Sequence, residues 1–457
     1  MTYPTLRAWL LRLRSEGQLA VVTRPVDPRF ELAAVTRRLD GRRAVWFARP
    51  GHGDVPVVAG IASTRPMLAA ACGTTEAGLV DRLLAAEAAP RPCAAVAQSE
   101  APVQRRVRRD DVDLLGFLPV PVHHEKDGGR HVSAGLCIVR DPATRVQNVS
   151  IHRLQVVGPD RFTALILPRH TDQLHRAAEA RGEALECAIV IGADVATILA
   201  SQSHVPFGVS ELEVASALHD QPLPVVRCRT VDIDVPAEAE VVIEGRIVPH
   251  ERLPEGPFGE FPRYYGPLSD KHVIDVSAVT HRERPIFHDI LPAGREHLLL
   301  GAVPREASLL RELRRTFPTV RAVHMTAGGS CRFHAVVAME KRQEGQARNV
   351  ILATLANNFD IKHVWVVDPD VDVFDAEAVE WAQATRFQAD RDVVVVSAAQ
   401  GSRLDPSADE GVSAKMGFDC TLPLDAEPGR YEVVRIPGAD AVDLAAYVDA
   451  AAELPEL

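Results

Sequence analysis

The spacing of apolar residues changes twice along the chain. Up to about residue 88, short apolar runs of strand length alternate with segments in which apolar residues recur at helical spacing, which is typical of an α/β domain. We expect helices over 6–15, 31–39 and 75–86, and strands over 19–22, 44–47 and 56–58. Residues 88–113 show no apolar period and are rich in proline, alanine and arginine, which indicates a connector.

Strand patterns dominate the middle of the chain. We expect helices over 171–181 and 210–218, and strands over 132–139, 146–157, 162–167, 188–191, 225–228, 240–247 and 273–279. Many strands with few helices favour a barrel-like sheet. After Pro304, helices and strands alternate again, which predicts a C-terminal α/β domain. We therefore predict an α/β (α+β) fold with domains over 1–113, 114–302 and 303–457.

Composition excludes several classes of protein. The chain has 457 residues, enough for roughly three domains of ~150 residues. Its net charge of −11 and its aromatic content of 5% argue against nucleic acid as a partner. No run approaches the ~18 apolar residues of a membrane helix, and arginines interrupt the first predicted helix, unlike a signal peptide. We expect a cytoplasmic protein that binds neither nucleic acid nor a membrane.

Several common motifs are missing. No GxGxxG or GxxxxGK motif occurs, which excludes a Rossmann fingerprint and a P-loop. Carboxylates over 368–372 are similar to the start of a calcium loop, but Val373 and Val379 stand where an EF-hand needs glycine and a carboxylate. The seven cysteines are scattered without a CxxC pair, and this pattern predicts reduced, mostly buried thiols.

Three separated residues of the middle region are candidate metal ligands. Asn148 lies in a predicted strand, His170 follows one, and Glu211 begins a predicted helix. Each has an ordinary structural explanation on its own: a hydrogen-bonded histidine, or a glutamate complementing a helix dipole. If the fold brings them together, their two oxygens and one nitrogen suit Mn²⁺ or Mg²⁺ beside a phosphate.

The segment 255–260, of sequence Glu-Gly-Pro-Phe-Gly-Glu, is the candidate for acid and base chemistry. Two carboxylates five positions apart diverge by ~140° on a helix and face opposite ways on a strand. Only a turn aims Glu255 and Glu260 into one cavity, and the glycines and proline between them permit it. An ordinary exposed turn is the alternative. Arg153 offers a planar fork that can bind a substrate carboxylate, and a nearby carboxylic acid can donate a proton.

With these segments in order, the sequence resembles the UbiD-type decarboxylases, which use prenylated FMN. The resemblance spans nearly the whole chain and rests on spaced motifs at 148–153, 167–170, 191–194 with 196–199, 210–211, 235–238 with 244–245, 255–260, and 414–417 with Asp419. It implies a central split β-barrel domain like that of flavin reductases, and a long helix leading to a C-terminal domain that contributes to oligomerisation. It also implies a flavin prenyltransferase as cofactor supplier and a homodimer, or a hexamer built from dimers.

The resemblance also implies a cofactor site. Asn148, His170 and Glu211 would hold Mn²⁺, with Mg²⁺ as the alternative, against the flavin phosphate. Lys415 would reach the same phosphate, and oxygens of Ala200, Ser201 and Ser203 would hold K⁺ beside Glu211. The predicted cofactor contacts are Asn148, Ser150, Ile151, His152, Arg153, Leu167, Arg169, His170, Glu211 and Lys415.

The family's catalytic trio matches Arg153, Glu255 and Glu260. By resemblance, Arg153 orients the carboxylate, Glu260 is the proton donor and Glu255 completes the ion-pair network of a reversible, non-oxidative decarboxylase. Its substrate would be an aromatic, heteroaromatic or α,β-unsaturated carboxylic acid. The substrate pocket is expected near Phe261, Pro262, 298–301 and Phe418, with His288 and His297 as polar contacts.

One geometric condition and two alternatives accompany this prediction. On a straight strand Asn148 and Arg153 would face opposite ways, so the chain must bend or break between them. An FMN-dependent oxidoreductase is the first alternative, although no nicotinamide fingerprint is present. A non-catalytic flavin carrier is the second, although a carrier has no need of Glu260.

Overall fold

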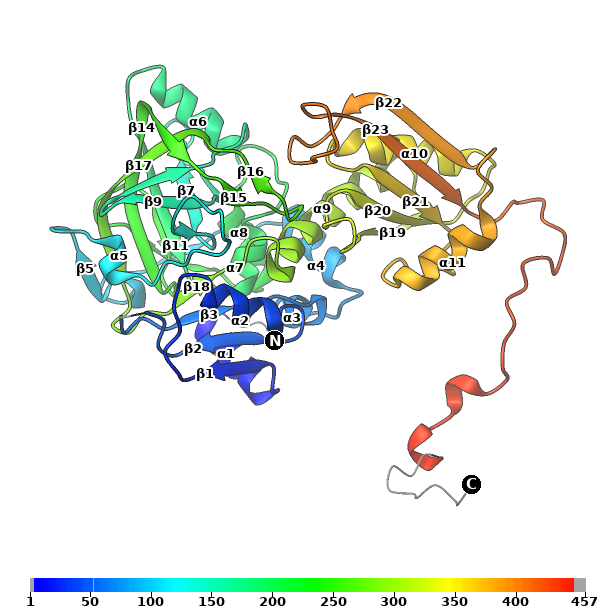
Figure 1. Ribbon diagram of the computed structural model, residues 1–457, viewed down its shortest axis with the longest axis horizontal. Coiled ribbons are helices and arrows are strands. Elements are labelled where there is room, and N and C mark those ends of the chain that lie inside the picture. The colour runs from blue at the N-terminus through cyan, green and yellow to red at the C-terminus, as the bar shows by residue number, and fades with distance from the viewer. Residues whose placement is uncertain (1–3, 52, 448–457) are drawn as a thin grey trace.

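The computed structural model describes residues 4–51 and 53–447. Figure 1 shows three parts: an N-terminal sheet with its helices, a large central sheet above it, and a C-terminal α/β domain to one side. One helix, α9, runs between the central region and the C-terminal domain, and the last described segment, which carries η2 and η3, leads away from the body of the molecule. The expected mixture of α and β over several sheets is confirmed.

The N-terminal sheet has four strands in the order β1-β2-β3-β18. The last strand comes from far along the chain, because Phe287–Asp289 pairs in parallel with Val57–Ala59. Its helices include α3, a seven-residue alanine-rich helix that the apolar pattern did not predict. The elements of this part are α1 Leu6–Ser15, β1 Leu19–Val22, α2 Glu31–Leu39, β2 Ala44–Phe47, β3 Val57–Ala59, α3 Arg65–Ala71, α4 Leu79–Ala88 and β18 Phe287–Asp289.

The central sheet is not a closed barrel. Its eight-strand path runs β6-β9-β10-β17-β14-β11-β7-β8, with β5 added beside β17, and the end strands β6 and β8 are not paired with each other. The strands are β5 Arg106–Arg108, β6 His131–Val132, β7 Leu136–Arg140, β8 Gln147–Ile151, β9 Leu154–Gly158, β10 Arg161–Ala164, β11 Leu185–Ile191, β14 Val241–Glu255 and β17 Ser269–His281.

Short elements surround this sheet. The predicted connector is ordered, since its residues supply β5, which pairs with β17 of the central sheet, and β4, which pairs with β12 in a separate three-stranded sheet of order β13-β12-β4. These elements are β4 Ala94–Ala95, η1 Pro102–Gln104, α5 Leu114–Phe117, α6 His170–Glu179, α7 Val195–Ala200, α8 Glu211–Leu218, β12 Pro224–Arg227, β13 Asp234–Pro236, β15 Phe258–Gly259 and β16 Tyr265–Gly266.

Two segments predicted as single strands are each broken. The first, 132–139, divides into β6 and β7, and the second, 146–157, divides into β8 and β9. His152 and Arg153 occupy the second break. A break between Asn148 and Arg153 was expected, because on one straight strand the two side chains would face opposite ways. Residues on the two sides of the observed break no longer belong to one pleated strand, so this restriction does not apply.

Helix α9, Arg295–Thr316, is longer than the alternation after Pro304 suggested. Proline favours the first turn of a helix, yet here Pro304 lies inside α9, and buried leucines on both sides of it hold the helix in the core. The predicted boundary at 302/303 therefore falls within a continuous helix.

The C-terminal sheet has five strands in the order β19-β20-β21-β23-β22. Strand β23, which carries Lys415, was not predicted as a strand. The elements are β19 Val320–Met325, β20 His334–Met339, α10 Gln346–Asn357, β21 His363–Val367, α11 Ala376–Arg386, β22 Val393–Gln400, β23 Val412–Cys420, η2 Ala439–Ala441 and η3 Leu444–Ala446.

The cysteines and the membrane-spanning potential of the helices were both considered from the sequence. All seven cysteines are unpaired, and six of them are buried, as predicted. In the part of the chain that the structure describes, no helix is both long enough and apolar enough to cross a membrane.

Candidate active site

The structure brings Arg153, Glu255 and Glu260 together. Arg153 lies in the break between β8 and β9, Glu255 ends β14, and Glu260 follows β15. The guanidinium binds Glu255 through two bonds, Nε to Oε1 at 2.8 Å and Nη2 to Oε2 at 2.7 Å. Its remaining nitrogen, Nη1, contacts Oε1 of Glu260. One cation therefore holds two carboxylates that are five positions apart in sequence.

A hairpin aims both carboxylates at Arg153, as the sequence predicted. Gly256 has a φ of +95°, a conformation that residues with a Cβ rarely adopt. Strand β15 pairs antiparallel with β16, and the Glu260 amide donates to the Tyr264 carbonyl at 2.9 Å. Glu255 is 0% exposed, whereas the Glu260 side chain retains 12% exposure. The two carboxylates thus contact one guanidinium, but Glu255 does so from a fully buried position and Glu260 from a partly exposed one.

A second loop, residues 124–131, holds this hairpin in place. Asp127 accepts a hydrogen bond from the Gly259 amide at 3.0 Å, and the Gly128 amide donates to the Pro257 carbonyl at 2.7 Å. A Cβ on Gly128 would collide with the carbonyl of Gly256. Sequence reasoning missed this loop, because its contacts use backbone atoms more than a hundred positions away and leave no pattern in the sequence.

The charge state of Glu255 follows from its neighbours. Burial opposes ionisation of this carboxyl group, but the interactions with His131 and Arg153 outweigh burial and hold the pKa of Glu255 below its usual value. Glu255 is therefore ionised at neutral pH and places a negative charge beside Arg153.

Two of the three predicted metal ligands are in direct contact. Nδ2 of Asn148 donates to Oε1 of Glu211 at 2.9 Å, and the Val149 amide donates to Oε2 at 2.7 Å. His170 begins α6, one position before Thr171, whose hydroxyl donates to Oδ1 of Asn148 at 2.9 Å. Within residues 4–51 and 53–447, no three His, Cys, Asp or Glu side chains form a metal-binding group, so a metal here depends on the Asn148 amide oxygen.

Glu211 is a buried carboxylate that suits a bound cation. It is 3% exposed, and burial raises its pKa to about 7 despite the hydrogen bonds from Val149 and Asn148. A cation beside it would offset this burial cost and favour the charged form. The donors present, a carboxylate, an amide and an imidazole, are the hard and intermediate ligands that Mn²⁺ accepts.

The other predicted cofactor contacts divide into two groups. Ser150 and His152 lie beside this cluster: their side chains are 2.9 Å apart, and Oγ of Ser150 is 3.2 Å from Oγ1 of Thr171. Ile151 ends β8, and Leu167 and Arg169 are exposed just before α6. Lys415 is separate from them, since its ammonium group donates to carbonyls of Leu355 and Phe359 in the C-terminal domain.

The predicted pocket residues lead to an arginine pair that the sequence did not reveal. Arg332 is buried, with its guanidinium 5.4 Å from the ring of Phe261, the residue after Glu260. Arg305, one turn beyond Gly301 in α9, donates to the Gly301 carbonyl at 2.7 Å. Among the described residues, no carboxylate forms an ion pair with either guanidinium within 4.0 Å, although the charge of Asp360 acts on both. Burial lowers the pKa of both arginines; the charge of Arg332 lowers that of Arg305 further, and the charge of Arg169 lowers that of Arg332.

Two histidines and a third arginine border this pair. Burial, and then the charges of Arg332 and Arg305, lower the pKa of His297 to about 3. The same causes with Arg169 lower the pKa of His204 to about 3. Arg169, one of the predicted flavin contacts, is close enough for its charge to act on both arginines, and Arg332 also contacts Phe261 beside Glu260. The region carries excess positive charge beside neutral imidazoles.

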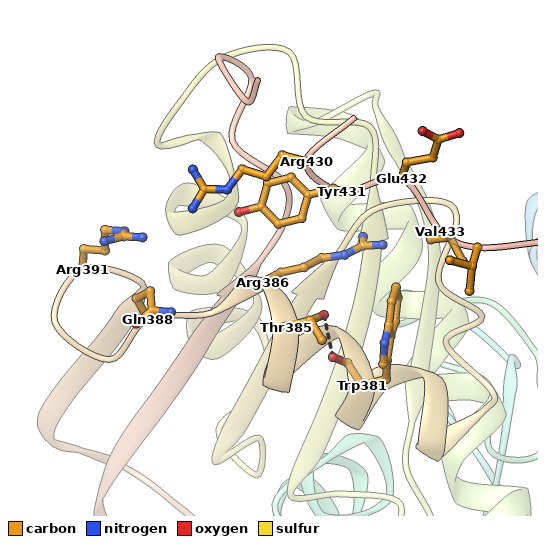
Figure 2. A pocket seen from close by; sticks show the side chains of 10 residues that line it. Trp381, Thr385, Arg386, Gln388, Arg391, Arg430, Tyr431, Glu432 and Val433 are labelled. Atoms are coloured by element: carbon orange, nitrogen blue, oxygen red, sulfur yellow. Dashed lines mark hydrogen bonds between the residues drawn. The ribbon is translucent and has the colours of Figure 1, made fainter. Parts of the chain in front are cut away.

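A separate cavity of about 600 Å³ lies in the C-terminal domain between α11 and residues 430–434 (Figure 2). Its one buried cation, Arg386, is already paired with Asp368 and Asp370. None of the predicted site residues lines this cavity, which therefore does not belong to the candidate active site.

Comparison with known proteins places this geometry in a family. Three models of 3-octaprenyl-4-hydroxybenzoate carboxy-lyase match in order: the N-terminal domain over residues 10–87, the Rift-related domain over 94–295 and the C-terminal domain over 298–420. The chain belongs to the UbiD family of carboxy-lyases. The recognition made from the spaced motifs is confirmed.

Relatives of this UbiD family member cover almost its full length. It is 41% identical to the anhydromevalonate phosphate decarboxylase of Methanothermobacter thermautotrophicus, over 88% of this chain and 94% of that protein. The UbiD-class enzyme HmfF from Pelotomaculum thermopropionicum, in complex with FMN, superimposes with a TM-score of 0.96 at 51% identity, covering 97% of this chain and all of that chain. An evolved dimeric form of HmfF in complex with prFMN gives 0.91 at 48%, covering 98% and 100%.

Proposed function

We propose that this UbiD family member catalyses the reversible decarboxylation of an aromatic, heteroaromatic or α,β-unsaturated carboxylic acid with prenylated FMN and Mn²⁺. The observation that carries the proposal is the guanidinium of Arg153 held between Glu255 and Glu260. Such a group offers a site for the substrate carboxylate and an adjacent proton donor. The FMN and prFMN bound in the HmfF structures support the cofactor.

The cofactor would be held by residues of the central domain. Asn148, His170 and Glu211 would bind Mn²⁺, or Mg²⁺ in its place, and Ser150 and His152 would line the flavin beside them. The oxygens of residues 200, 201 and 203 would hold K⁺, and Lys415 would approach the phosphate from the C-terminal domain. When bound, prenylated FMN supplies an acceptor for the electron pair that is left when CO₂ departs.

The chain's own residues position the acid and move the proton. Arg153 binds the substrate carboxylate, and Glu255, ionised and buried, keeps the guanidinium in place. Once CO₂ has left, Glu260 delivers a proton to the substrate carbon, and the electron pair of the broken bond returns to that carbon to form the new C–H bond. Glu260 then regains a proton from water, which its partial exposure allows. In the carboxylation direction Glu260 takes the proton back.

The arginine pair favours a substrate with a second anionic group. Arg332 is buried and Arg305 is half-buried, burial lowers the pKa of both, and Asp360 acts on them without forming an ion pair, so an anion from the substrate would offset the remaining cost. The anion would lie near Phe261, the residue after Glu260, where the guanidinium of Arg332 is 5.4 Å from the phenyl ring. The named substrate of the relatives, anhydromevalonate phosphate, carries such a group in addition to the carboxylate that is lost.

Replacing Arg332 by glutamine should test this substrate class. We expect KM for a dicarboxylate to rise about tenfold to hundredfold, because a hydrogen bond to a charged group is lost, with little change for the matching monoacid. Pairs such as benzoate with isophthalate and furoate with furandicarboxylate provide the measurement. Arg321→Gln, at an exposed arginine of β19, is the control. Equal effects on both members of a pair would contradict a second anion site.

The reaction class is tested by the ligand that the protein retains. We expect denaturing mass spectrometry of protein co-expressed with a flavin prenyltransferase to release prenylated FMN, and metal analysis of the same sample to give Mn²⁺. Plain FMN, or no flavin despite the supply, would contradict the proposal and favour the oxidoreductase or carrier alternatives. Light scattering on the same sample tests the predicted homodimer or hexamer.

A further inference from the structure

His131, outside the predicted catalytic trio, contacts Glu255. Its side chain is fully buried at the start of β6, and Nε2 lies 3.4 Å from Oε1 of Glu255. Nδ1 lies 3.0 Å from the carbonyl oxygen of Gly129. The ring packs on Phe258, with centroids 4.5 Å apart, and the guanidinium of Arg153 lies 5.0 Å from the centre of the same phenyl ring. His131 thus contacts two residues of the hairpin that carries both carboxylates.

We propose that His131 is a positioning residue: it donates a hydrogen bond to Glu255 and keeps this carboxylate in place while Arg153 engages the substrate. The inference rests on the proposed function, because it concerns the ion-pair network that the decarboxylation uses. His131 does not touch the reacting atoms and acts only through Glu255.

The need for a second donor follows from the bonds of Arg153. Nε and Nη2 are engaged by Glu255, and Nη1 is engaged by Glu260. Nη1 and Nη2 each keep a second N–H, so a substrate carboxylate that binds there shares the charge of Arg153 with both glutamates and weakens its hold on Glu255. Glu255 is completely buried, and a buried carboxylate that loses a donor needs another one. His131 is within reach to supply it from the opposite side.

The surroundings of the imidazole fit this role. Nδ1 lies near the Gly129 carbonyl, and Nε2 is a buried nitrogen that has no hydrogen-bond partner among the described residues and lies 3.4 Å from Oε1 of Glu255, so a small shift of that carboxylate brings it into hydrogen-bond distance. The titratable and charged groups facing Glu255 are His131 from β6 and Arg153 from the β8/β9 break, and Glu260 shares Arg153. The interaction with His131 is among the causes that hold the pKa of Glu255 below its usual value.

Two variants separate this role from simple packing. His131→Leu keeps an apolar side chain in the cavity but removes the donor, and His131→Gln keeps an uncharged donor. His281→Leu is the matched control, since His281 is also buried, lies 2.7 Å from a backbone carbonyl through Nδ1 and packs on Phe117 at 4.6 Å. Among the described residues, the hydrogen bonds of His281 involve Arg108 and the Arg282 carbonyl, and none involves the catalytic trio.

The first readout does not depend on turnover. The infrared band of the protonated Glu255 carboxyl, identified by its loss in Glu255→Gln, is followed against pH in flavin-loaded protein. We expect its midpoint to move to higher pH in His131→Leu, to move less in His131→Gln and to stay unchanged in His281→Leu. An unchanged midpoint in His131→Leu overturns the proposal, whatever the reaction of the enzyme proves to be.

The second readout connects the position of Glu255 to the reaction. We expect kcat/KM to fall about tenfold or more in His131→Leu and to be partly restored in His131→Gln, and the acid limb of its pH profile to move with the infrared midpoint. Flavin content and melting temperature should match those of His281→Leu. A moved midpoint without decarboxylation of any acid would leave His131 as a partner of Glu255 and count against the proposed function instead.

Discussion

Replacing Glu260 by glutamine is expected to lower kcat by about a hundredfold to ten-thousandfold, which is the contribution of a positioned general acid. Glutamine fills nearly the same space and can still contact Arg153, but its amide does not deliver a proton to carbon. The network around Glu255 stays intact, because that carboxylate has its own two bonds to Arg153. Flavin and metal content should therefore be unchanged while CO₂ release is lost.

The control for this variant is Glu251→Gln. Glu251 lies on the same strand as Glu255 and also pairs with an arginine, Arg161, but at the surface. We expect normal turnover from it, since an exposed ion pair contributes little to stability and has no proton to deliver to the substrate. CO₂ release by Glu260→Gln at the rate of Glu251→Gln would show that the acid has been assigned to the wrong residue.

Replacing Glu211 by alanine is expected to remove both Mn²⁺ and flavin from the purified protein. The variant loses the one carboxylate of the proposed metal site and also the acceptor for Asn148 and for the Val149 amide. The fold should survive, because the carboxylate is buried without a cationic side chain and its burial alone raises its pKa to about 7. Flavin absorbance and metal analysis on the same sample give the result.

Glu213→Ala is the matched variant for this test, since Glu213 occupies the same first turn of α8 two positions later. It should retain flavin and metal at the level of the unmodified protein. If Glu211→Ala kept both, the cluster of Asn148, Glu211 and Thr171 would be a structural hydrogen-bond network and no metal site.

Features that depend on neighbouring residues were predicted well from the sequence. The strands at 19–22 and 44–47 begin and end as expected, because their apolar runs are bounded by polar residues and turns. The hairpin of Glu255 and Glu260 was predicted from Gly256, Pro257 and Gly259, whose backbone preferences act over a few residues. Helix α3 was missed because its seven residues, which end in three alanines, are too few to show a helical period of apolar positions.

Features that depend on distant contacts were not predictable in this way. The breaks that divide β6 from β7 and β8 from β9 lie inside segments whose pattern predicts single strands, and the strands on the two sides of each break pair with different neighbours: β6 with β9 but β7 with β11, and β8 with β7 but β9 with β10. The same holds for α9, where burial on both sides of Pro304 outweighs the local preference of proline for a helix start. In both cases tertiary packing overrides a local signal.

The sequence by itself determined the family, the mixed α/β architecture and the identity of the three residues that meet at the candidate active site. Spaced motifs and local turn chemistry suffice for these, because they act through residue type and short separation. Only the tertiary structure decided that His131 contacts Glu255, that the 124–131 loop holds the hairpin and that Arg305 lies near Arg332. Those contacts join segments that are far apart in the chain. Each depends on a single side chain or backbone group, and the spacing of apolar residues along the sequence carries no information about such pairs.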